Sequence, residues 1–318
     1  MATPRILVGC DPELFLKNSE DKFISAHDIL PGTKAEPHPV SLGAVQVDGV
    51  AAEFNITPAA SAGQFITNIH QVMTSLKDFT KGQNLAITPF ANFEPSYFNS
   101  LPDTVKELGC NPDFNAWTGQ VNPPPDASGT MRTASGHLHV GWLEGKGTNP
   151  FNKFHFEDCR IMVKQLDYYI GIYSLMWDPD NTRRQLYGKA GAMRPKSYGV
   201  EYRVLSNQWL KSQRVMEWLF GAVQKAAGAL FSGKKSMEEL FGDYAQKVID
   251  NNEVGWSFTK EGQLVHAATG LTMPDLRDFQ DPKLRKPRFV SGEGRSVKEM
   301  ELLRVLGYTI KDVTVKAT

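Results

Sequence analysis

The sequence has few cysteines and no long apolar run, and both absences narrow the class of protein. Its 318 residues include three cysteines, Cys10, Cys110 and Cys159, which lie far apart and form no CxxC pair. An odd number of separated thiols favours a reducing compartment over a disulfide framework or a zinc site. No stretch reaches the ~20 apolar residues of a membrane helix, and the N-terminus lacks the apolar core of a signal peptide. We therefore expect a cytoplasmic protein with no membrane partner.

The chain also lacks a net charge and the common nucleotide motifs. Lys+Arg and Asp+Glu balance at 35 each, so overall charge gives no reason to expect bulk binding to nucleic acid. Neither GxxxxGK[ST] nor GxGxxG occurs, which excludes a P-loop and a Rossmann site. Hydrophobic residues make up 41% and charged residues 22%, as is typical of a folded globular protein.

The order of β-like and helical patterns predicts an α+β fold. Asp48 and Gly49 lie between two β-prone runs, which is a strong hairpin signal. Apolar spacing predicts the helices, and segment 111–132, rich in Pro, Asn, Asp and Gly, predicts a long loop. We expect strands at 5–8, 14–17, 85–93, 137–142 and 200–205, and helices at 62–80, 156–176, 212–231, 236–251 and 297–306.

The expected domain organisation is simple. Residues 1–254 would form one domain that carries all the motifs below. The polar segment 255–318 would be a C-terminal appendix of the same domain, and we can assign no function to it.

Four expected strands carry polar residues two positions apart, which places both on one face of the strand. The pairs are Asp11 and Glu13, Glu53 and Asn55, His137 and His139, and Glu201 and Arg203. Taken singly, each has a structural explanation: a polar strand edge, packed histidines or a cross-strand ion pair. Together, carboxylates that converge from apolar strands repel one another unless a cation neutralises them. Carboxylates with imidazole and without cysteine favour Mg²⁺ or Mn²⁺ over zinc.

A basic segment precedes the last of these strands. Residues 183–196 contain five cations in fourteen residues, together with Gly188 and Gly191, which would allow the backbone to approach a ligand closely. Magnesium usually shares its shell with substrate phosphates, and this segment is a candidate to bind them. The alternative is a solvated loop with scattered basic residues.

These motifs, in this order, resemble one known family. They are CDPE (10–13), DGVAAEFN (48–55), SGHLHVG (135–141), YGKAGAMR (187–194) and GVEYR (199–203). The combination resembles the phage-type carboxylate–amine ligases, the phiEco32-like COOH·NH2 ligase type 2 group. That group is a distant part of the glutamine synthetase and glutamate–cysteine ligase superfamily. The resemblance covers about residues 6–210, and it places the protein in the host cytoplasm if a phage encodes it.

The resemblance implies a glutamine-synthetase-like catalytic domain. A largely antiparallel sheet would form a metal-lined funnel with helices packed on one face, and would hold two or three Mg²⁺ or Mn²⁺ ions and ATP. The implied metal ligands are Asp11, Glu13, Glu53, His137 and Glu201. The implied ATP-binding residues are Arg184, Lys189, Arg194 and His139. Arg203 and Arg194 would act on the transferred phosphate, and Asp48 would deprotonate the amine.

The implied activity is ATP-dependent formation of an amide or peptide bond. ATP would phosphorylate a carboxylate, and an amine would attack the acyl phosphate; both substrates would be small molecules or peptides. Two other classes stay open: a metal-dependent hydrolase that activates water with the same residues, and a non-catalytic binding or virion module that kept the fold. A requirement for ATP separates the ligase from the hydrolase.

Overall fold

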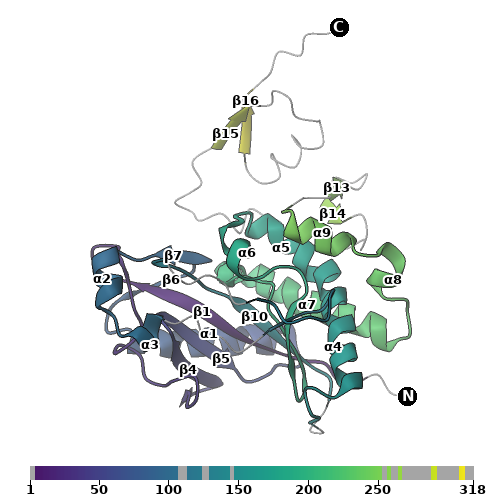
Figure 1. The fold of residues 1–318 in the computed structure, drawn as a ribbon, viewed down its shortest axis with the longest axis horizontal. Coiled ribbons are helices and arrows are strands. Elements are labelled where there is room, and N and C mark those ends of the chain that lie inside the picture. The colour runs from purple at the N-terminus through teal and green to yellow at the C-terminus, as the bar shows by residue number, and fades with distance from the viewer. Residues whose placement is uncertain are drawn as a thin grey trace. The chain divides into compact units, whose positions relative to one another are not determined.

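In the computed structural model, the chain divides into two compact units, Met1–Val254 and Gly255–Thr318, which are described separately (Figure 1). The structure describes residues 4–106, 113–123, 129–143 and 147–252, and the backbone of four short strands in the second unit. There, β13 (Trp256–Phe258) pairs antiparallel with β14 (Leu264–His266), and β15 (Arg288–Ser291) pairs parallel with β16 (Tyr308–Lys311). The helix expected at 297–306 lies outside the described residues, and the appendix assignment stays a prediction.

The first unit is built on a large antiparallel sheet, and the α+β class is therefore confirmed. Its strands run in the order β3 (His38–Val40), β4 (Gly43–Asp48), β5 (Ala51–Ile56), β1 (Leu7–Lys17), β10 (Gly136–Gly141), β12 (Gly199–Tyr202), β11 (Ala192–Lys196) and β8 (Phe114–Asn115). Two further strands, β2 (Phe23–Ile24) and β6 (Asn84–Ala86), pair with β1. A separate short ribbon joins β7 (Phe90–Asn92) to β9 (Met131–Thr133). The sheet is open, with β1 at its centre.

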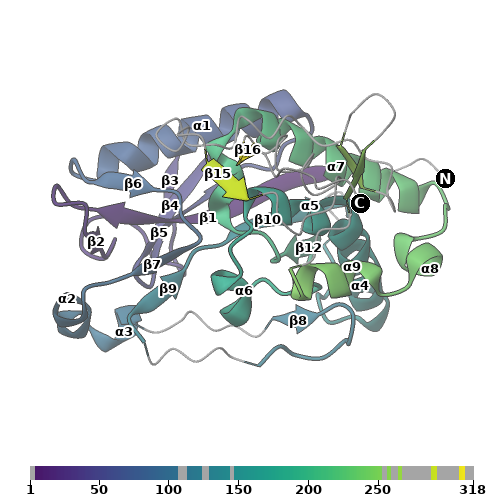
Figure 2. The same ribbon diagram turned by 90° about the horizontal axis from the view of Figure 1, so that it is seen from above.

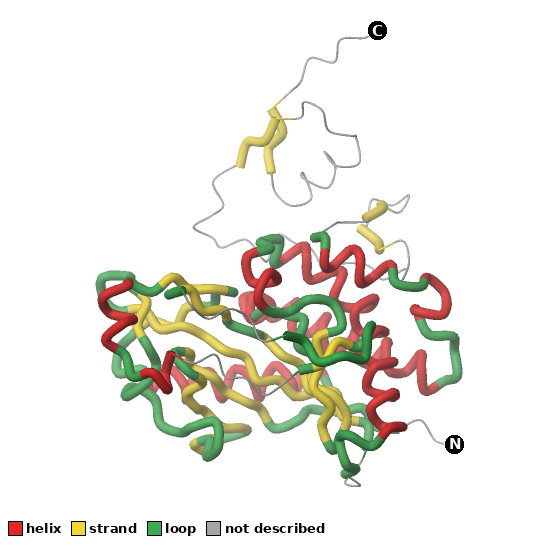
Figure 3. The backbone as a smooth tube through the Cα atoms, in the orientation of Figure 1, coloured by secondary structure: helices red, strands yellow, loops and turns green. Residues whose placement is uncertain are grey.

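Two long helices pack against the sheet, and a third long helix packs against both of them (Figures 2 and 3). Helix α1 (Ala62–Phe79) contacts β4, β5 and α7 (Gln213–Phe231), whereas α4 (Lys153–Leu166) contacts β11 and β12. The remaining helical elements are α2 (Pro95–Ser100), α3 (Asp103–Lys106), the π-helix η1 (Asp167–Gly171), α5 (Ile172–Trp177), α6 (Thr182–Leu186), the 3-10 helix η2 (Asn207–Lys211), α8 (Met237–Phe241) and α9 (Tyr244–Asp250). No helix among the described residues is long and apolar enough to cross a membrane.

The structure corrects several expected elements. The two strands predicted at 5–8 and 14–17 form one strand, β1, which runs through the DPE tripeptide. The strand predicted at 85–93 divides into β6 and β7, because Pro89 lies between them and has no N–H for a sheet. The helix predicted at 236–251 is interrupted at Gly242, whose φ of 64° is left-handed.

Two longer segments also differ from expectation. The helix predicted at 156–176 contains the π-helical turn η1. The basic segment 183–196 is not one loop, since part of it lies in α6 and part in β11. Within the predicted loop 111–132, the described residues include β8 and the first part of β9.

An apolar cluster lies on the face of β1 that also carries Asp11 and Glu13. Phe15 is two positions after Glu13 and therefore on the same face. It packs edge-on against Phe23 and Phe93, and Val50 and Ala51 belong to the same buried cluster. Because Val50 and Ala51 also line a cavity, this cluster forms an apolar end wall for the site described below.

The π-helix carries a fully buried carboxyl group, Asp167. Its oxygens accept hydrogen bonds from Trp117 Nε1 at 2.7 Å and from the Tyr202 hydroxyl at 2.8 Å. Burial raises the pKa of Asp167 to about 7, although both hydrogen bonds act in the opposite direction. The folded protein therefore keeps a proton that the unfolded chain releases near pH 4.

We expect this proton to make stability depend on pH. Because the folded state binds more protons between about pH 4 and pH 7, the free energy of unfolding should fall across that range, by at most about 4 kcal/mol. Asp167→Asn, neutral at every pH, should remove this fall and be more stable than wild type at pH 8. Urea unfolding at pH 5 and pH 8 measures the effect, and Asp78→Asn on the exposed side of α1 is the control. Equal pH dependence in all three proteins would contradict the prediction.

Candidate active site

Three strands bring one imidazole and two carboxylates together. Asp11 on β1 is in register with His137 on β10, and Glu201 lies on the next strand, β12. His137 Nδ1 lies 3.5 Å from Asp11 Oδ1 and 3.5 Å from Glu201 Oε1. One ligand atom from each residue falls within 4.8 Å of the others. The structure thus brings together three of the five predicted metal ligands.

The chemistry of these three groups suits a hard divalent cation. Burial, reinforced by the positive charge of Arg203, lowers the pKa of His137 to about 4. Its imidazole is therefore neutral at neutral pH, as a metal ligand must be. Asp11 Oδ1 is buried and accepts no hydrogen bond from the described residues. A bound cation would satisfy this oxygen, and two carboxylates with one imidazole match the preferences of Mg²⁺ or Mn²⁺.

The other two predicted ligands, Glu13 and Glu53, face each other across β1 and β5. Desolvation, followed by the negative charge of Asp48, raises the pKa of Glu13 to about 7. Desolvation and the neighbouring carboxylates also raise the pKa of Glu53. Glu13 accepts a hydrogen bond from Ser135 N at 2.8 Å, and Glu53 accepts one from Gln46 Nε2 at 2.6 Å. Paired carboxylates in register are unfavourable, and a cation between them would relieve their repulsion.

Cations surround Glu201, whose side chain is 1% exposed. It is hydrogen-bonded to Arg203, and its oxygens lie 2.7 Å from Lys196 Nζ and 3.3 Å from Arg194 Nη1. Desolvation opposes ionisation of Glu201, but Arg203, His137 and other positive neighbours hold its pKa well below the usual range. Arg203 also donates to Asp113 at 3.1 Å. Both predicted phosphate-binding arginines, Arg194 and Arg203, therefore lie at the site.

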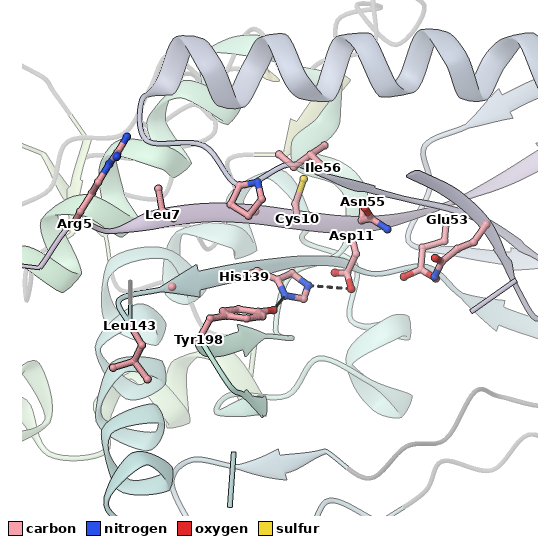
Figure 4. A pocket seen from close by; sticks show the side chains of 14 residues that line it. Arg5, Leu7, Cys10, Asp11, Glu53, Asn55, Ile56, His139, Leu143 and Tyr198 are labelled. Carbon is pink, nitrogen blue, oxygen red and sulfur yellow. Dashed lines mark hydrogen bonds and ion pairs between the residues drawn. The ribbon is translucent and has the colours of Figure 1, made fainter. Parts of the chain in front are cut away.

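His139 lies between Asp11 and Tyr198 and contacts both side chains. Its Nε2 lies 3.0 Å from Asp11 Oδ2, and its Nδ1 is hydrogen-bonded to the Tyr198 hydroxyl (Figure 4). Desolvation acts to lower the pKa of His139, but the Asp11 carboxylate outweighs it and raises that pKa. The Asp11 carboxylate thus favours the protonated form of His139, with which it forms an ion pair.

Two cavities meet at this centre and share Asp11, Gln46 and Glu53. One has a volume of about 310 Å³ and a charged lining. Its lining includes Glu13, Lys34, Asp48, Arg132, His137, Arg194, Lys196, Glu201 and Arg203. The other, about 460 Å³, is mostly apolar (Figure 4). Leu7, Ile56, Pro58, Leu143 and Tyr198 line it, together with Arg5, Asn55 and His139.

Two predicted ATP-binding residues do not lie at either cavity. Arg184 is buried on α6, where it donates to Asp178 O at 2.9 Å and lies 3.6 Å from the Asp178 carboxylate. Lys189 is exposed, and its charge acts on Asp250. Spacing in the sequence grouped both with Arg194, but a helix and a turn direct them away from the strand that carries Arg194.

The glycines of the basic segment approach the protein itself. A Cβ on Gly188, whose φ is +80°, would lie 2.0 Å from Arg183 Nη1, and one on Gly191 would lie 2.6 Å from Trp117 Cδ1. Close packing of the segment against its own protein therefore accounts for both glycines. The predicted approach to a ligand is not what these glycines provide in this structure.

Asp48 lies at the charged cavity, paired with Lys34 Nζ at 2.8 Å. Sequence reasoning did not identify Lys34, because it lies on a loop with no periodic pattern. It also did not identify Gln46, although Gln46 lies two positions from Asp48. It included Lys196 only as one cation of the basic segment 183–196, although Lys196 lies two positions from Arg194. The same-face rule would have found both.

We expect His137→Ala to weaken Mn²⁺ binding at least tenfold, because it removes the nitrogen that faces both carboxylates. Paramagnetic resonance of free Mn²⁺, without nucleotide, measures the affinity. His38→Ala is the control, since His38 lies on the edge strand β3 and lines neither cavity. Unchanged Mn²⁺ affinity with a lower melting temperature would instead favour a packed structural histidine.

Comparison with known families supports the resemblance over part of the chain. The model of the family described as Phage phiEco32-like COOH.NH2 ligase-type 2 matches residues 133–236. The matched segment agrees with the family resemblance seen in the motifs, and it contains His137, His139, Arg194, Glu201 and Arg203. Asp11, Glu13, Asp48 and Glu53 precede the matched segment. No curated protein matches the chain.

Proposed function

We propose that the protein is an ATP-dependent carboxylate–amine ligase with a glutamine-synthetase-like fold. The observation that carries the proposal is the convergence of Asp11, His137 and Glu201 beside Arg194 and Arg203. Phosphoryl transfer is mainly a matter of position and charge neutralisation, and this centre offers metal ligands and phosphate-binding cations together. The match to a family of COOH·NH2 ligases supports the same activity.

The proposed metal sites divide between two groups of side chains. Asp11, His137 and Glu201 would hold one divalent ion, and Glu13 with Glu53 would hold another. The bound ions would neutralise phosphate oxygens and so favour transfer of the terminal phosphoryl group of ATP. The raised pKa of Glu13 means that this carboxyl releases its proton near neutral pH when a cation binds.

The chain's own residues would do the remaining work in the charged cavity. Arg203 and Arg194 would bind the transferring phosphoryl group and the acyl phosphate, and their positive charge would offset the negative charge on both. The amine must lose a proton before it attacks the acyl carbon. Asp48, at the same cavity and paired with Lys34, would accept that proton.

The apolar cavity suits the nucleotide. Leu7, Pro58 and Leu143 provide apolar contact for a planar ring, and Tyr198 adds an aromatic face. His139 lies at this cavity and at Asp11, so the phosphate chain would pass His139 to reach the metal ligands. The carboxylate and amine substrates would then occupy the charged cavity.

The test is product formation with ATP. The protein is incubated with Mg²⁺, ATP and a panel of amino acids and peptides, and phosphate release is followed with mass spectrometry of the products. We expect ADP, phosphate and an amide product that requires both cosubstrates. Absence of any affinity for ATP or ADP in the presence of Mg²⁺ would contradict the ligase proposal. Cleavage of an amide without nucleotide would favour the hydrolase instead.

A further inference from the structure

Arg183 is a fully buried cation behind the charged cavity. It lies on α6, its side chain is 0% exposed, and it lines neither cavity. No carboxylate among the described residues lies within ion-pairing distance of its guanidinium. A buried guanidinium without a close counter-ion is unfavourable, so its stabilisation depends on hydrogen bonds to neutral acceptors.

The guanidinium donates to two segments that carry site residues. Arg183 Nη2 donates to Ser135 Oγ at 3.0 Å, immediately before β10. Nη1 donates to Val204 O at 2.9 Å, and Nη2 lies 3.4 Å from Arg203 O, immediately after β12. The planar guanidinium of Arg183 therefore connects the segment just before β10 to the segment just after the neighbouring strand β12.

Each of these two segments contacts or carries a side chain that lines the charged cavity. Ser135 N donates to Glu13 Oε2 at 2.8 Å, while Ser135 O accepts from Glu13 N at 2.9 Å. On the other segment, the Arg203 side chain is hydrogen-bonded to Glu201 and lies near His137. The guanidinium thus contacts Ser135, which is hydrogen-bonded to Glu13, and it contacts the main chain of Arg203 directly.

The surrounding loop is shaped to admit this side chain. Gly188 adopts a φ of +80°, and a Cβ there would lie 2.0 Å from Arg183 Nη1 and 2.7 Å from Val204 O. Only glycine allows the loop to close over the guanidinium without displacing it.

We propose that Arg183 is a positioning residue, which fixes Glu13 and Arg203 relative to each other by holding Ser135 and the main chain at Arg203 and Val204. This inference rests on the proposed function, because it concerns the same cavity. A flat, forked donor can span both segments, whereas the ammonium of lysine is a single point charge. Replacing Arg183 by lysine should therefore disturb the positions of Glu13 and Arg203, although the positive charge is kept.

The test compares Arg183→Lys, Ser135→Ala and the double variant by Mn²⁺ affinity without nucleotide. We expect each single change to weaken Mn²⁺ binding about fivefold. We expect Ser135→Ala to add less than twofold in the Arg183→Lys background, because both changes break the same connection. Arg160→Lys is the matched control: Arg160 Nε donates to Ala116 O at 2.8 Å away from both cavities, and its Mn²⁺ affinity should not change.

The outcomes separate this inference from the proposed function. Wild-type protein that binds no Mn²⁺ would contradict both. Wild-type binding with equal affinity in Arg183→Lys, or additive effects in the double variant, would contradict the positioning role alone. If Arg183→Lys does not fold, Ser135→Ala decides: unchanged Mn²⁺ affinity in that variant overturns the inference.

Discussion

Glu201→Gln is expected to lower ATP-dependent product formation at least 1000-fold, or about 4 kcal/mol in transition-state stabilisation. The carboxylate is buried, faces His137 and contacts Arg194, Lys196 and Arg203. The amide keeps its shape but removes the negative charge that a divalent cation requires. It also leaves three cations without their common partner, so Mn²⁺ affinity should fall together with turnover.

The same substitution should lower stability, because those cations would repel one another in a partly buried site. Turnover is therefore measured below the onset of unfolding, with circular dichroism to verify the fold. Glu157→Gln is the control, since Glu157 is half exposed and pairs with Arg160 on the surface of α4. A folded Glu201→Gln variant with full activity would show that this carboxylate is neither a metal ligand nor essential.

Arg203→Lys should reduce the rate of acyl-phosphate formation at least 100-fold while leaving a folded protein. The arginine is hydrogen-bonded to Glu201, Asp113 and His137, which places its guanidinium within the charged cavity. Lysine keeps the positive charge but cannot make several hydrogen bonds in one plane. Arg203→Ala, which removes the charge as well, should reduce the rate further.

Rapid-quench measurement of ADP formation in a single turnover isolates this step from product release. Arg214→Ala, on the exposed side of α7, serves as the control. If Arg203→Lys lowered only the affinity for ATP and kept the single-turnover rate at saturation, Arg203 would bind the nucleotide ground state rather than the transferring group.

The same-face rule explains why much of the site was predictable. His137 and His139, or Glu201 and Arg203, are two positions apart, so any strand conformation places each pair on one face. Their flanking apolar residues identified the strands, and β10 and β12 formed as expected. The α+β class agrees with a first half rich in period-two patterns followed by period-3.6 patterns, whereas the antiparallel sheet was expected from the family resemblance.

Neighbours across the sheet were not predictable in this way. Nothing local to Asp11 indicates that β1 pairs with β5 on one side and β10 on the other. Likewise, Arg184 and Lys189 look equivalent to Arg194 in the sequence, but helical and turn geometry direct them elsewhere. Lys34 reaches Asp48 from a loop, through a tertiary contact that no local period encodes.

The two cavities share three lining residues, and binding in one cavity is therefore coupled to binding in the other. Asp11, Gln46 and Glu53 line both spaces, so any occupant of one changes the electric field and the side-chain freedom felt in the other. Affinities that depend on the same three side chains are linked, and linkage is reciprocal: if filling the apolar space tightens binding in the charged one, the reverse holds by the same factor. Because these three side chains belong to both cavities, the two spaces form one thermodynamic unit, in which the order of filling alters the affinity of each binding step but not the total free energy.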